Sequence, residues 1–159
     1  MPIPSSELVL NADGSIYHLH LLPEQIASTI ITVGDPDRVS AVSRHFDRMD
    51  CQVQKREFVT HTGYVGNKRL TVISTGIGTD NIDIVLNELD ALVNIDLHSR
   101  LPKPNITPLT IVRLGTSGGL QPDIPLHSIV ASAVGVGFDG LMHYYKYPIS
   151  DMEANLAKA

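Results

Sequence analysis

The stretch Ile111-Val112-Arg113-Leu114-Gly115-Thr116-Ser117-Gly118-Gly119 decides the fold class that the sequence predicts. A short apolar run that ends in glycines is typical of a buried interior strand of an α/β sheet, and ligands of such sheets bind beyond the carboxyl ends of the strands. Arg113 lies near that end, beside glycine N–H groups and the hydroxyls of Thr116 and Ser117, which together suit a phosphate-sized anion. The alternative is a tight turn in which Arg113 pairs with a structural carboxylate.

Composition narrows the class of protein. The 159 residues are 43% hydrophobic and 18% charged, which is typical of one globular domain with a core. A net charge of -5 disfavours nucleic-acid and membrane-surface partners, so an anion site has to be built from a few arginines. The lone Cys51 excludes an internal disulfide and is typical of a reducing compartment. With no signal-peptide pattern and no apolar run of about twenty residues, we expect a soluble, cytoplasmic protein.

A second strand-to-helix turn follows the β-branched run 29–33, which predicts a strand. Asp35 and Pro36 are typical of the N-cap and the first position of a helix, so the turn at Gly34 predicts an anion site at a helix N-terminus. Arg38 lies in the first helical turn, where a cation opposes the helix dipole. This indicates another partner for Arg38, such as a bound phosphate; the alternative is an ordinary surface arginine.

The middle of the chain predicts two more strands. Residues 51–60 alternate loosely, and a strand there places Arg56 and Glu57 on opposite faces. Gly66-Asn67 predicts a hairpin turn before a strand over 70–74.

A third glycine-rich turn, over residues 74–81, precedes the clearest amphipathic helix of the chain, from Ile82 to Val93. The G-x-G of this turn lacks the third glycine of the dinucleotide fingerprint, and no Walker lysine follows it. The pattern therefore disfavours a nicotinamide or nucleoside-triphosphate site.

The remaining segments are a proline-rich stretch, a strand and a helix. Three prolines make 96–108 a predicted surface insertion, and 128–134 predicts a further strand. Residues 150–153 match a capping box that opens a helix. Because this helix reaches the last residue, Ala159, we expect the sequence to be part of a longer protein.

Three arginines and three glycine-rich turns all favour the same kind of ligand. Arg38, Arg56 and Arg113 occupy predicted sheet-edge positions in an acidic chain. Charge-assisted hydrogen bonds contribute roughly 1.5–3 kcal/mol each, so the three guanidiniums together predict a firmly held oxyanion.

Six short segments carry a family resemblance, and in order they are Tyr17-His18-Leu19, Gly34-Asp35-Pro36-Asp37-Arg38-Val39, Arg56-Glu57-Phe58, Ser74-Thr75-Gly76-Ile77-Gly78, Asn87-Glu88-Leu89 and Arg113-Leu114-Gly115-Thr116-Ser117-Gly118. Over residues 16–147 the sequence resembles the N-terminal half of the nucleoside phosphorylase-I family, on its uridine phosphorylase branch. The resemblance implies an α/β fold of three layers, α/β/α, with a mixed, partly barrel-like central sheet. Residues 1–159 are then the N-terminal part of a single domain whose C-terminal half lies outside this chain.

The resemblance also implies roles for individual residues. Phosphate is bound by Gly34, Arg38, Arg113 and Thr116. Arg56 reaches the same phosphate from a neighbouring subunit, and His18 reaches the ribose 5′-hydroxyl across that interface, although His18 in a polar arm is by itself typical of a surface histidine. Shared sites imply a homo-oligomer, either a dimer or a trimer of dimers.

A monovalent cation is the one inorganic cofactor that the resemblance suggests. Glu57, Ile77 and Asn81 fall where some relatives hold such a cation, but Asn81 stands in place of the expected hydroxyl residue. Inorganic phosphate is the co-substrate, and no other cofactor is implied.

The implied activity is that of a pentosyltransferase. Phosphate attacks the anomeric carbon of a nucleoside, uridine first, through an oxocarbenium-like transition state, and the products are ribose 1-phosphate and free base. No side chain acts as nucleophile or as acid or base, in accord with the absence of a nucleophile–base motif. The family's base-recognition residues lie beyond residue 159, so we expect this fragment to be inactive alone.

The sequence leaves four alternative functions open. A purine nucleoside phosphorylase shares the fold, and so does a nucleosidase, which uses water in place of phosphate and does not keep the phosphate arginines. A non-catalytic phosphate- or nucleoside-binding module keeps the anion site without turnover. A structural domain uses the arginines for interface ion pairs.

Overall fold

The computed structural model describes residues 1–158 of the chain, which form two compact units, Met1–Gly118 and Gly119–Ala159. None of the helices in the described part of the chain is long and apolar enough to cross a membrane.

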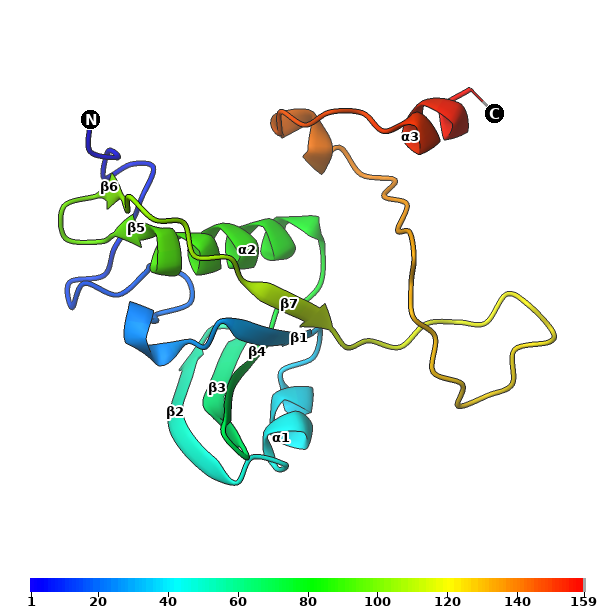
Figure 1. Cartoon of the computed structure of the whole chain (residues 1–159), viewed down its shortest axis with the longest axis horizontal. Helices are drawn as coiled ribbons and strands as arrows, with labels where there is room; N and C mark the ends of the chain where they lie inside the picture. The colour runs from blue at the N-terminus through cyan, green and yellow to red at the C-terminus, as the bar shows by residue number, and fades with distance from the viewer. Residues whose placement is uncertain (159) are drawn as a thin grey trace. The chain divides into compact units, whose positions relative to one another are not determined.

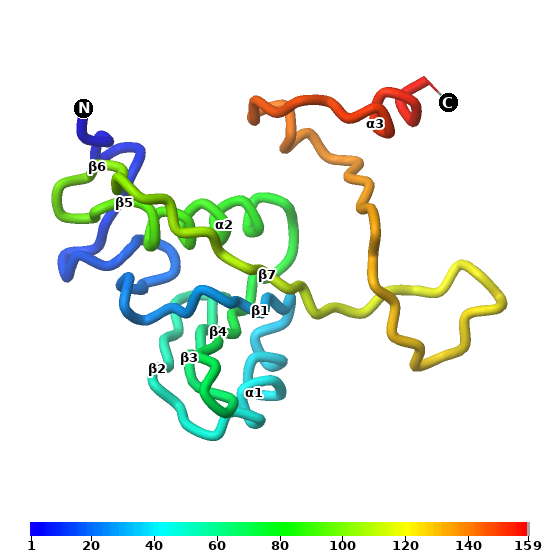
Figure 2. The backbone as a smooth tube through the Cα atoms, viewed as in Figure 1, coloured from blue at the N-terminus to red at the C-terminus, as the bar shows by residue number. Residues whose placement is uncertain are grey.

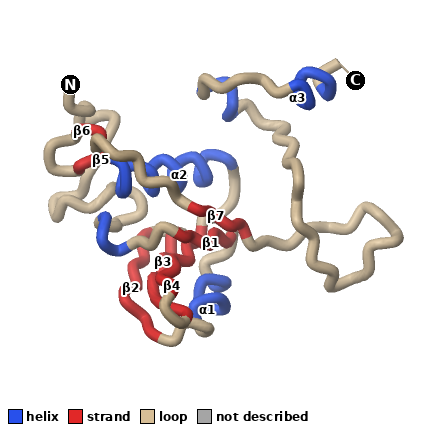
Figure 3. The backbone as a smooth tube through the Cα atoms, viewed as in Figure 1, coloured by secondary structure: helices blue, strands red, loops and turns tan. Residues whose placement is uncertain are grey.

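The first unit is built around a five-stranded mixed sheet of order β2-β3-β4-β1-β7 (Figures 1 and 3). Strands β2, β3 and β4 are antiparallel neighbours, whereas β1 runs parallel to both β4 and β7. Its elements are the 3-10 turn η1 (Pro23–Gln25), β1 (Thr29–Val33), α1 (Asp37–Ser43), β2 (Arg48–Lys55), β3 (Phe58–Val65), β4 (Lys68–Ser74), α2 (Thr79–Asn94), β5 (Ile95–Asp96), β6 (Leu101–Pro102) and β7 (Thr110–Arg113). The predicted strand at 29–33, the hairpin at Gly66-Asn67 and the amphipathic helix are confirmed.

The two longer helices of this unit cover opposite faces of the sheet (Figure 1). Successive side chains of a strand point to opposite faces, so Ile30 and Ile73 pack in the same cluster as α2, whereas Val33 and Val72 pack with Val39 of α1. Helix, sheet and helix make the three layers that the family resemblance predicts.

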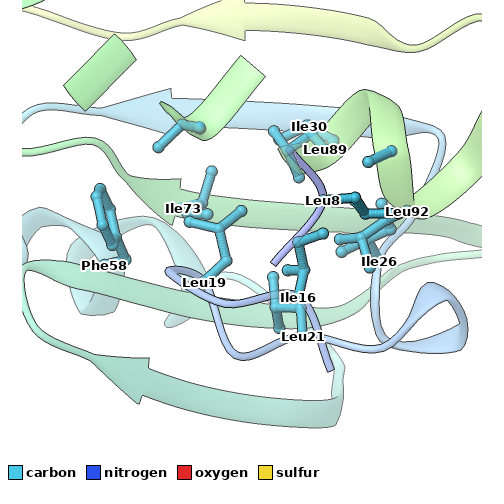
Figure 4. Packing of buried hydrophobic residues seen from close by; sticks show 12 residues of the cluster. Leu8, Ile16, Leu19, Leu21, Ile26, Ile30, Phe58, Ile73, Leu89 and Leu92 are labelled. Atoms are coloured by element: carbon cyan, nitrogen blue, oxygen red, sulfur yellow. The ribbon is translucent and has the colours of Figure 1, made fainter. Parts of the chain in front are cut away.

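The N-terminal segment completes the core on the α2 side (Figures 2 and 4). Ile16, Leu19 and Leu21 are fully buried there beside Leu89 and Leu92 of α2. A fully buried leucine or isoleucine contributes about 1.5–3 kcal/mol, so this segment is part of the core and not a loose arm.

The strand predicted over 51–60 is wrong in one respect, because the chain reverses inside it. Lys55 pairs with Phe58, and Arg56-Glu57 is the two-residue connection between β2 and β3. Arg56 has a φ of 55°, in the left-handed region that tight hairpin turns require. Arg56 and Glu57 are therefore turn residues and do not lie on opposite faces of one strand.

The strand that carries Arg113 is present, but it is not buried. β7 pairs with β1 on one side and forms the edge of the sheet on the other, within the part of the chain that the structure describes. Ile111 and Val112 are exposed as a result. The predicted strand is confirmed, but its buried interior position is wrong in the described residues, because β7 has a neighbouring strand on one side only.

The segment predicted as a surface insertion, 96–108, lies largely at the surface, and its first part forms the short β5–β6 ladder. Asn94, at the end of α2, ties the rest to the helix: its Oδ1 accepts from the Thr107 N–H at 2.7 Å.

The second unit holds two short helical elements, η2 (Leu141–Tyr144) and α3 (Asp151–Leu156). The predicted capping box is confirmed, because Ser150 Oγ accepts from the Glu153 N–H and the Glu153 carboxylate accepts from the Ser150 N–H. The strand predicted over 128–134 is wrong, since this segment is irregular and exposed (Figure 3). β-branched residues favour a strand when a neighbouring strand packs against them, and the described residues of this unit form none.

Candidate functional site

An open cavity of about 660 Å³ lies in the first unit, among the turns that follow its parallel strands. β1 runs parallel to β4 and β7, so their carboxyl ends meet at one edge of the sheet, where α/β proteins bind ligands. Six of the nine residues that the sequence predicts for the site line this cavity. The full lining is Gly34, Asp35, Pro36, Arg38, Glu57, Gly76, Ile77, Asn81 and Thr116.

The turn after β1 supplies a helix start to the cavity. Helix α1 begins at Asp37 with Pro36 at its N-cap, one residue later than predicted, and Asp35 Oδ1 accepts a hydrogen bond of 2.9 Å from the Asp37 N–H across this turn. Arg38 follows in the first turn with its side chain exposed. The helix ends at Ser43.

Arg113 packs against the same turn from the end of β7. A Cβ atom added at Gly34 would lie 3.4 Å from Arg113 Nη2, and one added at Gly115 would lie 3.1 Å from Nη1. Nη1 donates a 2.8 Å hydrogen bond to the Leu114 carbonyl oxygen. The guanidinium is thereby held between two glycines, where a side chain at Gly34 would press on it.

Within the described residues, no carboxylate forms an ion pair with Arg38, Arg56 or Arg113. The pairing of Arg113 with a structural carboxylate, which the sequence left open, is thus not formed. These guanidiniums keep their hydrogen-bonding capacity for an anion.

Glu57 and Asn81 form the wall of the cavity opposite the helix start. Asn81 Nδ2 donates a 3.0 Å hydrogen bond to Glu57 Oε1, and the turn glycine Gly76 lies against both residues. Gly76 has a φ of 65°, and a Cβ atom there would lie 2.5 Å from Asn81 Nδ2 and 3.0 Å from Glu57 Cγ. Only glycine fits this position.

The predicted cation ligands Glu57, Ile77 and Asn81 therefore do come together. A monovalent cation would need the Glu57 carboxylate, the Ile77 carbonyl oxygen and the Asn81 amide oxygen, because an isoleucine has no other ligand atom. In this structure the Asn81 amide nitrogen faces Glu57 and supplies a hydrogen-bond donor to the carboxylate instead. The arrangement as it stands does not fit a cation, and no chemical step is derived through one.

Arg56 and His18 lie together at a second place in the first unit. Arg56 Cζ is 6.0 Å from the centre of the Tyr17 ring, and the Tyr17 and His18 rings meet edge to face at 4.9 Å. Neither Arg56 nor His18 lines the cavity, among the residues that the structure describes. We call Tyr17, His18 and Arg56 the aromatic–arginine cluster.

Sequence reasoning missed the contact that holds this cluster. Glu88 of α2 accepts a 2.7 Å hydrogen bond from His18 Nδ1 and further bonds from the backbone N–H groups of His18 and Leu19. The residues are about 70 positions apart, so no local pattern reveals the pair. The signal in the sequence is the segment Asn87-Glu88-Leu89, which the family resemblance includes without assigning a role to Glu88.

A partly buried serine–histidine pair joins α1 and β3, where Ser43 Oγ and His61 Nδ1 are 2.8 Å apart. Partial burial lowers the pKa of His61. Neither residue lines the cavity, so the pair joins α1 to β3 and is not a nucleophile–base pair of this site.

The chemistry that the cavity supports is anion binding. Arg38 and Thr116 line the cavity from the turns after the parallel strands β1 and β7, and Arg113 packs behind Gly34 of the same lining. Such donors orient an oxyanion and stabilise charge without forming a covalent bond to it.

Comparison with known proteins places this arrangement in a family. A sequence profile described as the phosphorylase superfamily matches residues 28–157. The uridine phosphorylase of Treponema pallidum is 33% identical over 129 residues, which cover 81% of this chain and 45% of that protein. A DeoD-type purine nucleoside phosphorylase of Thermoanaerobacter is 32% identical over 114 residues, covering 71% and 43%.

The fold is shared with solved structures as well. A Trypanosoma brucei nucleoside phosphorylase, whose crystal structure is described as showing uridine phosphorylase activity, superposes with a TM-score of 0.67 at 36% identity. The match covers 74% of this chain and 41% of that one. The chain thus spans about half the length of the relatives that it matches. With the profile match over most of its residues, this chain belongs to the phosphorylase superfamily.

Proposed function

We propose that this protein cleaves the N-glycosidic bond of a nucleoside with inorganic phosphate, and that uridine is its substrate. One observation carries the proposal: Gly34, Arg38 and Thr116 line one cavity at the ends of parallel strands, and the Arg113 guanidinium packs against Gly34 of that lining. The similarity to uridine phosphorylases supports the choice of nucleoside.

The residues act on phosphate, which is itself the nucleophile. Arg38 and Arg113 hold the phosphate dianion by charge-assisted hydrogen bonds, and Thr116 donates a further bond from its hydroxyl. A phosphate oxygen forms a bond to the anomeric carbon while the carbon–nitrogen bond breaks and its electron pair leaves with the base. The bound negative charge stabilises the oxocarbenium-like transition state, so no side-chain nucleophile is needed.

The aromatic–arginine cluster serves the cavity of a neighbouring subunit in this proposal. Arg56 and His18 lie together, and neither lines the cavity of its own chain; the family resemblance supports a role for both in another copy. Arg56 then adds a third guanidinium to the phosphate, and His18 contacts the ribose 5′-hydroxyl. A dimer is the smallest unit that completes two such sites, and a trimer of dimers repeats it.

The test is an assay of uridine cleavage by the protein purified from its native source, run with and without phosphate. The amounts of uracil, free ribose and ribose 1-phosphate are measured. We expect uracil release that requires phosphate and yields ribose 1-phosphate in equal amount. Phosphate-independent release with free ribose would indicate a nucleosidase and overturn the proposal. Phosphate binding without turnover of any nucleoside would indicate a binding module.

Purine nucleosides are the second candidate substrates, because the chain is also similar to a purine nucleoside phosphorylase over 71% of its length. Inosine and adenosine belong in the same assay. A higher kcat/KM for either purine nucleoside than for uridine would keep phosphorolysis and replace uridine as the substrate.

A further inference from the structure

Glu88 is a half-buried carboxylate whose hydrogen bonds all go to one short segment. Its side chain is 12% exposed, and its two oxygens lie 2.7 Å from His18 Nδ1, 3.0 and 3.1 Å from the His18 backbone nitrogen and 2.9 Å from the Leu19 backbone nitrogen. The carboxylate thus fixes both the backbone and the ring of the residue that we place at the sugar.

The bond to the ring has a chemical consequence beyond anchoring. An ionised carboxylate only accepts hydrogen bonds, so His18 Nδ1 must carry the hydrogen. In a neutral imidazole the other nitrogen, Nε2, then has no hydrogen and is an acceptor. The His18 side chain is 29% exposed, and within the described residues no hydrogen bond is formed by Nε2.

The ring is also restrained by its neighbour. The edge-to-face contact with Tyr17, at an interplanar angle of 79°, limits rotation about the side-chain bonds of His18. Hydrogen bond and ring contact together leave one orientation in which Nε2 faces away from α2.

We propose that Glu88 is a positioning residue, which holds His18 in the Nδ1–H tautomer so that Nε2 accepts the hydrogen of a substrate hydroxyl. This rests on the proposed function, in which that hydroxyl is the ribose 5′-OH. Carboxylates that orient histidines in this way fix the tautomer of the ring, and loss of such a partner commonly costs 10- to 100-fold in metal sites.

Glu88→Gln separates positioning from anchoring. Glutamine keeps the size of the side chain, but it has one acceptor oxygen and one NH₂ donor. If the oxygen accepts from the two backbone N–H groups, the NH₂ group donates to His18 Nδ1 and reverses the tautomer. Glu7→Gln, at an exposed position of the N-terminal segment, removes the same charge and is the matched control.

The first measurement is the tautomer of His18, read from the ring nitrogen shifts of ¹⁵N-labelled protein. We expect Nδ1–H in the parent and in Glu7→Gln, and Nε2–H in Glu88→Gln. The second is kcat/KM for uridine and for 5′-deoxyuridine, which lacks the hydroxyl. Glu88→Gln should raise KM for uridine about tenfold and leave 5′-deoxyuridine unchanged.

An unchanged tautomer in Glu88→Gln, or an equal loss for both nucleosides, would overturn the proposal, because a merely structural role lowers both alike. If the parent protein cleaves no nucleoside, the proposed function fails while the tautomer measurement still decides the role of Glu88. If Glu88→Gln does not fold, His18→Asn replaces it: its Nδ2 can donate to Glu88, but it has no Nε2. It should lose the preference for uridine over 5′-deoxyuridine, and a retained preference would overturn the proposal.

Discussion

The cavity and the aromatic–arginine cluster are built in opposite ways. The cavity is lined by turns that follow strands, and Gly34 and Gly76 hold its walls at van der Waals distance, so one chain assembles it. The cluster is an exposed group from the N-terminal segment and a hairpin tip, held through Glu88 from about 70 residues away. Local strand–turn–helix patterns position the first, whereas the second depends on a contact between residues about 70 positions apart.

This contrast predicts different effects for substitutions in the two places. Changes in the cavity should abolish phosphate binding in the chain that carries them. Changes in the cluster should leave that chain's own phosphate pocket intact and impair a neighbour's site.

The largest expected effect comes from the cavity. Arg38→Ala removes a charge-assisted bond to phosphate, so we expect kcat/KM for phosphate to fall about 10- to 100-fold. Arg44→Ala, at the other end of α1, is the control and should change it less than twofold. Equal losses in the two variants would mean that Arg38 acts through the general field of α1 and does not bind phosphate.

Mixing variants tests whether the cluster serves a neighbour. Arg38→Ala and Arg56→Ala, co-expressed with different tags, should form mixed dimers in which one of two sites has both arginines. Random pairing restores about a quarter of the parent activity, well above either variant alone. Activity no higher than the average of the two variants would assign Arg56 to the cavity of its own chain.

The sequence predicted the cavity better than the cluster for a physical reason. Strand, glycine turn and helix start are local patterns, so Gly34, Arg38 and Asn81 were placed correctly at strand ends. Arg56-Glu57 has no glycine or asparagine, and nothing local indicated a hairpin turn with Arg56 at positive φ. The Glu88–His18 contact depends on tertiary packing, which periodicity does not report.

The sequence also failed to predict whether a strand is buried. The apolar pattern at 110–113 correctly indicates a strand, but whether it is interior depends on a neighbouring strand. The segment 128–134 has β-branched residues and forms no strand, because propensity alone does not provide a ladder partner.

Gly76 offers a sharper test of how closely the cavity is packed. Gly76→Ala and Gly66→Ala both force alanine into a left-handed φ, at about 1 kcal/mol each. At Gly66 nothing lies within 4 Å of the new Cβ, whereas at Gly76 it meets Asn81 and Glu57. We expect Gly76→Ala to lower the free energy of unfolding by about 1–3 kcal/mol more than Gly66→Ala, in urea titrations. Equal losses would mean that Glu57 and Asn81 move aside freely.

The smallest expected effect concerns the helix that carries Arg38. Burial lowers the pKa of His61, whose ring is hydrogen-bonded to Ser43 of α1. As pH falls below about 6.5, the unfolded chain binds a proton at His61 that the folded chain does not, so the free energy of unfolding decreases. His61→Asn, which can still bond to Ser43, should show a shallower decrease between pH 7 and pH 5. His98→Asn, in the exposed β5–β6 connection, is the matched control.

Denaturant titrations between pH 7 and pH 5 measure the free energy of unfolding of each variant. If this free energy decreases as steeply in His61→Asn as in the parent, then His61 is protonated as easily in the folded protein as in the unfolded chain. In that case the contact between α1 and β3 would not depend on pH.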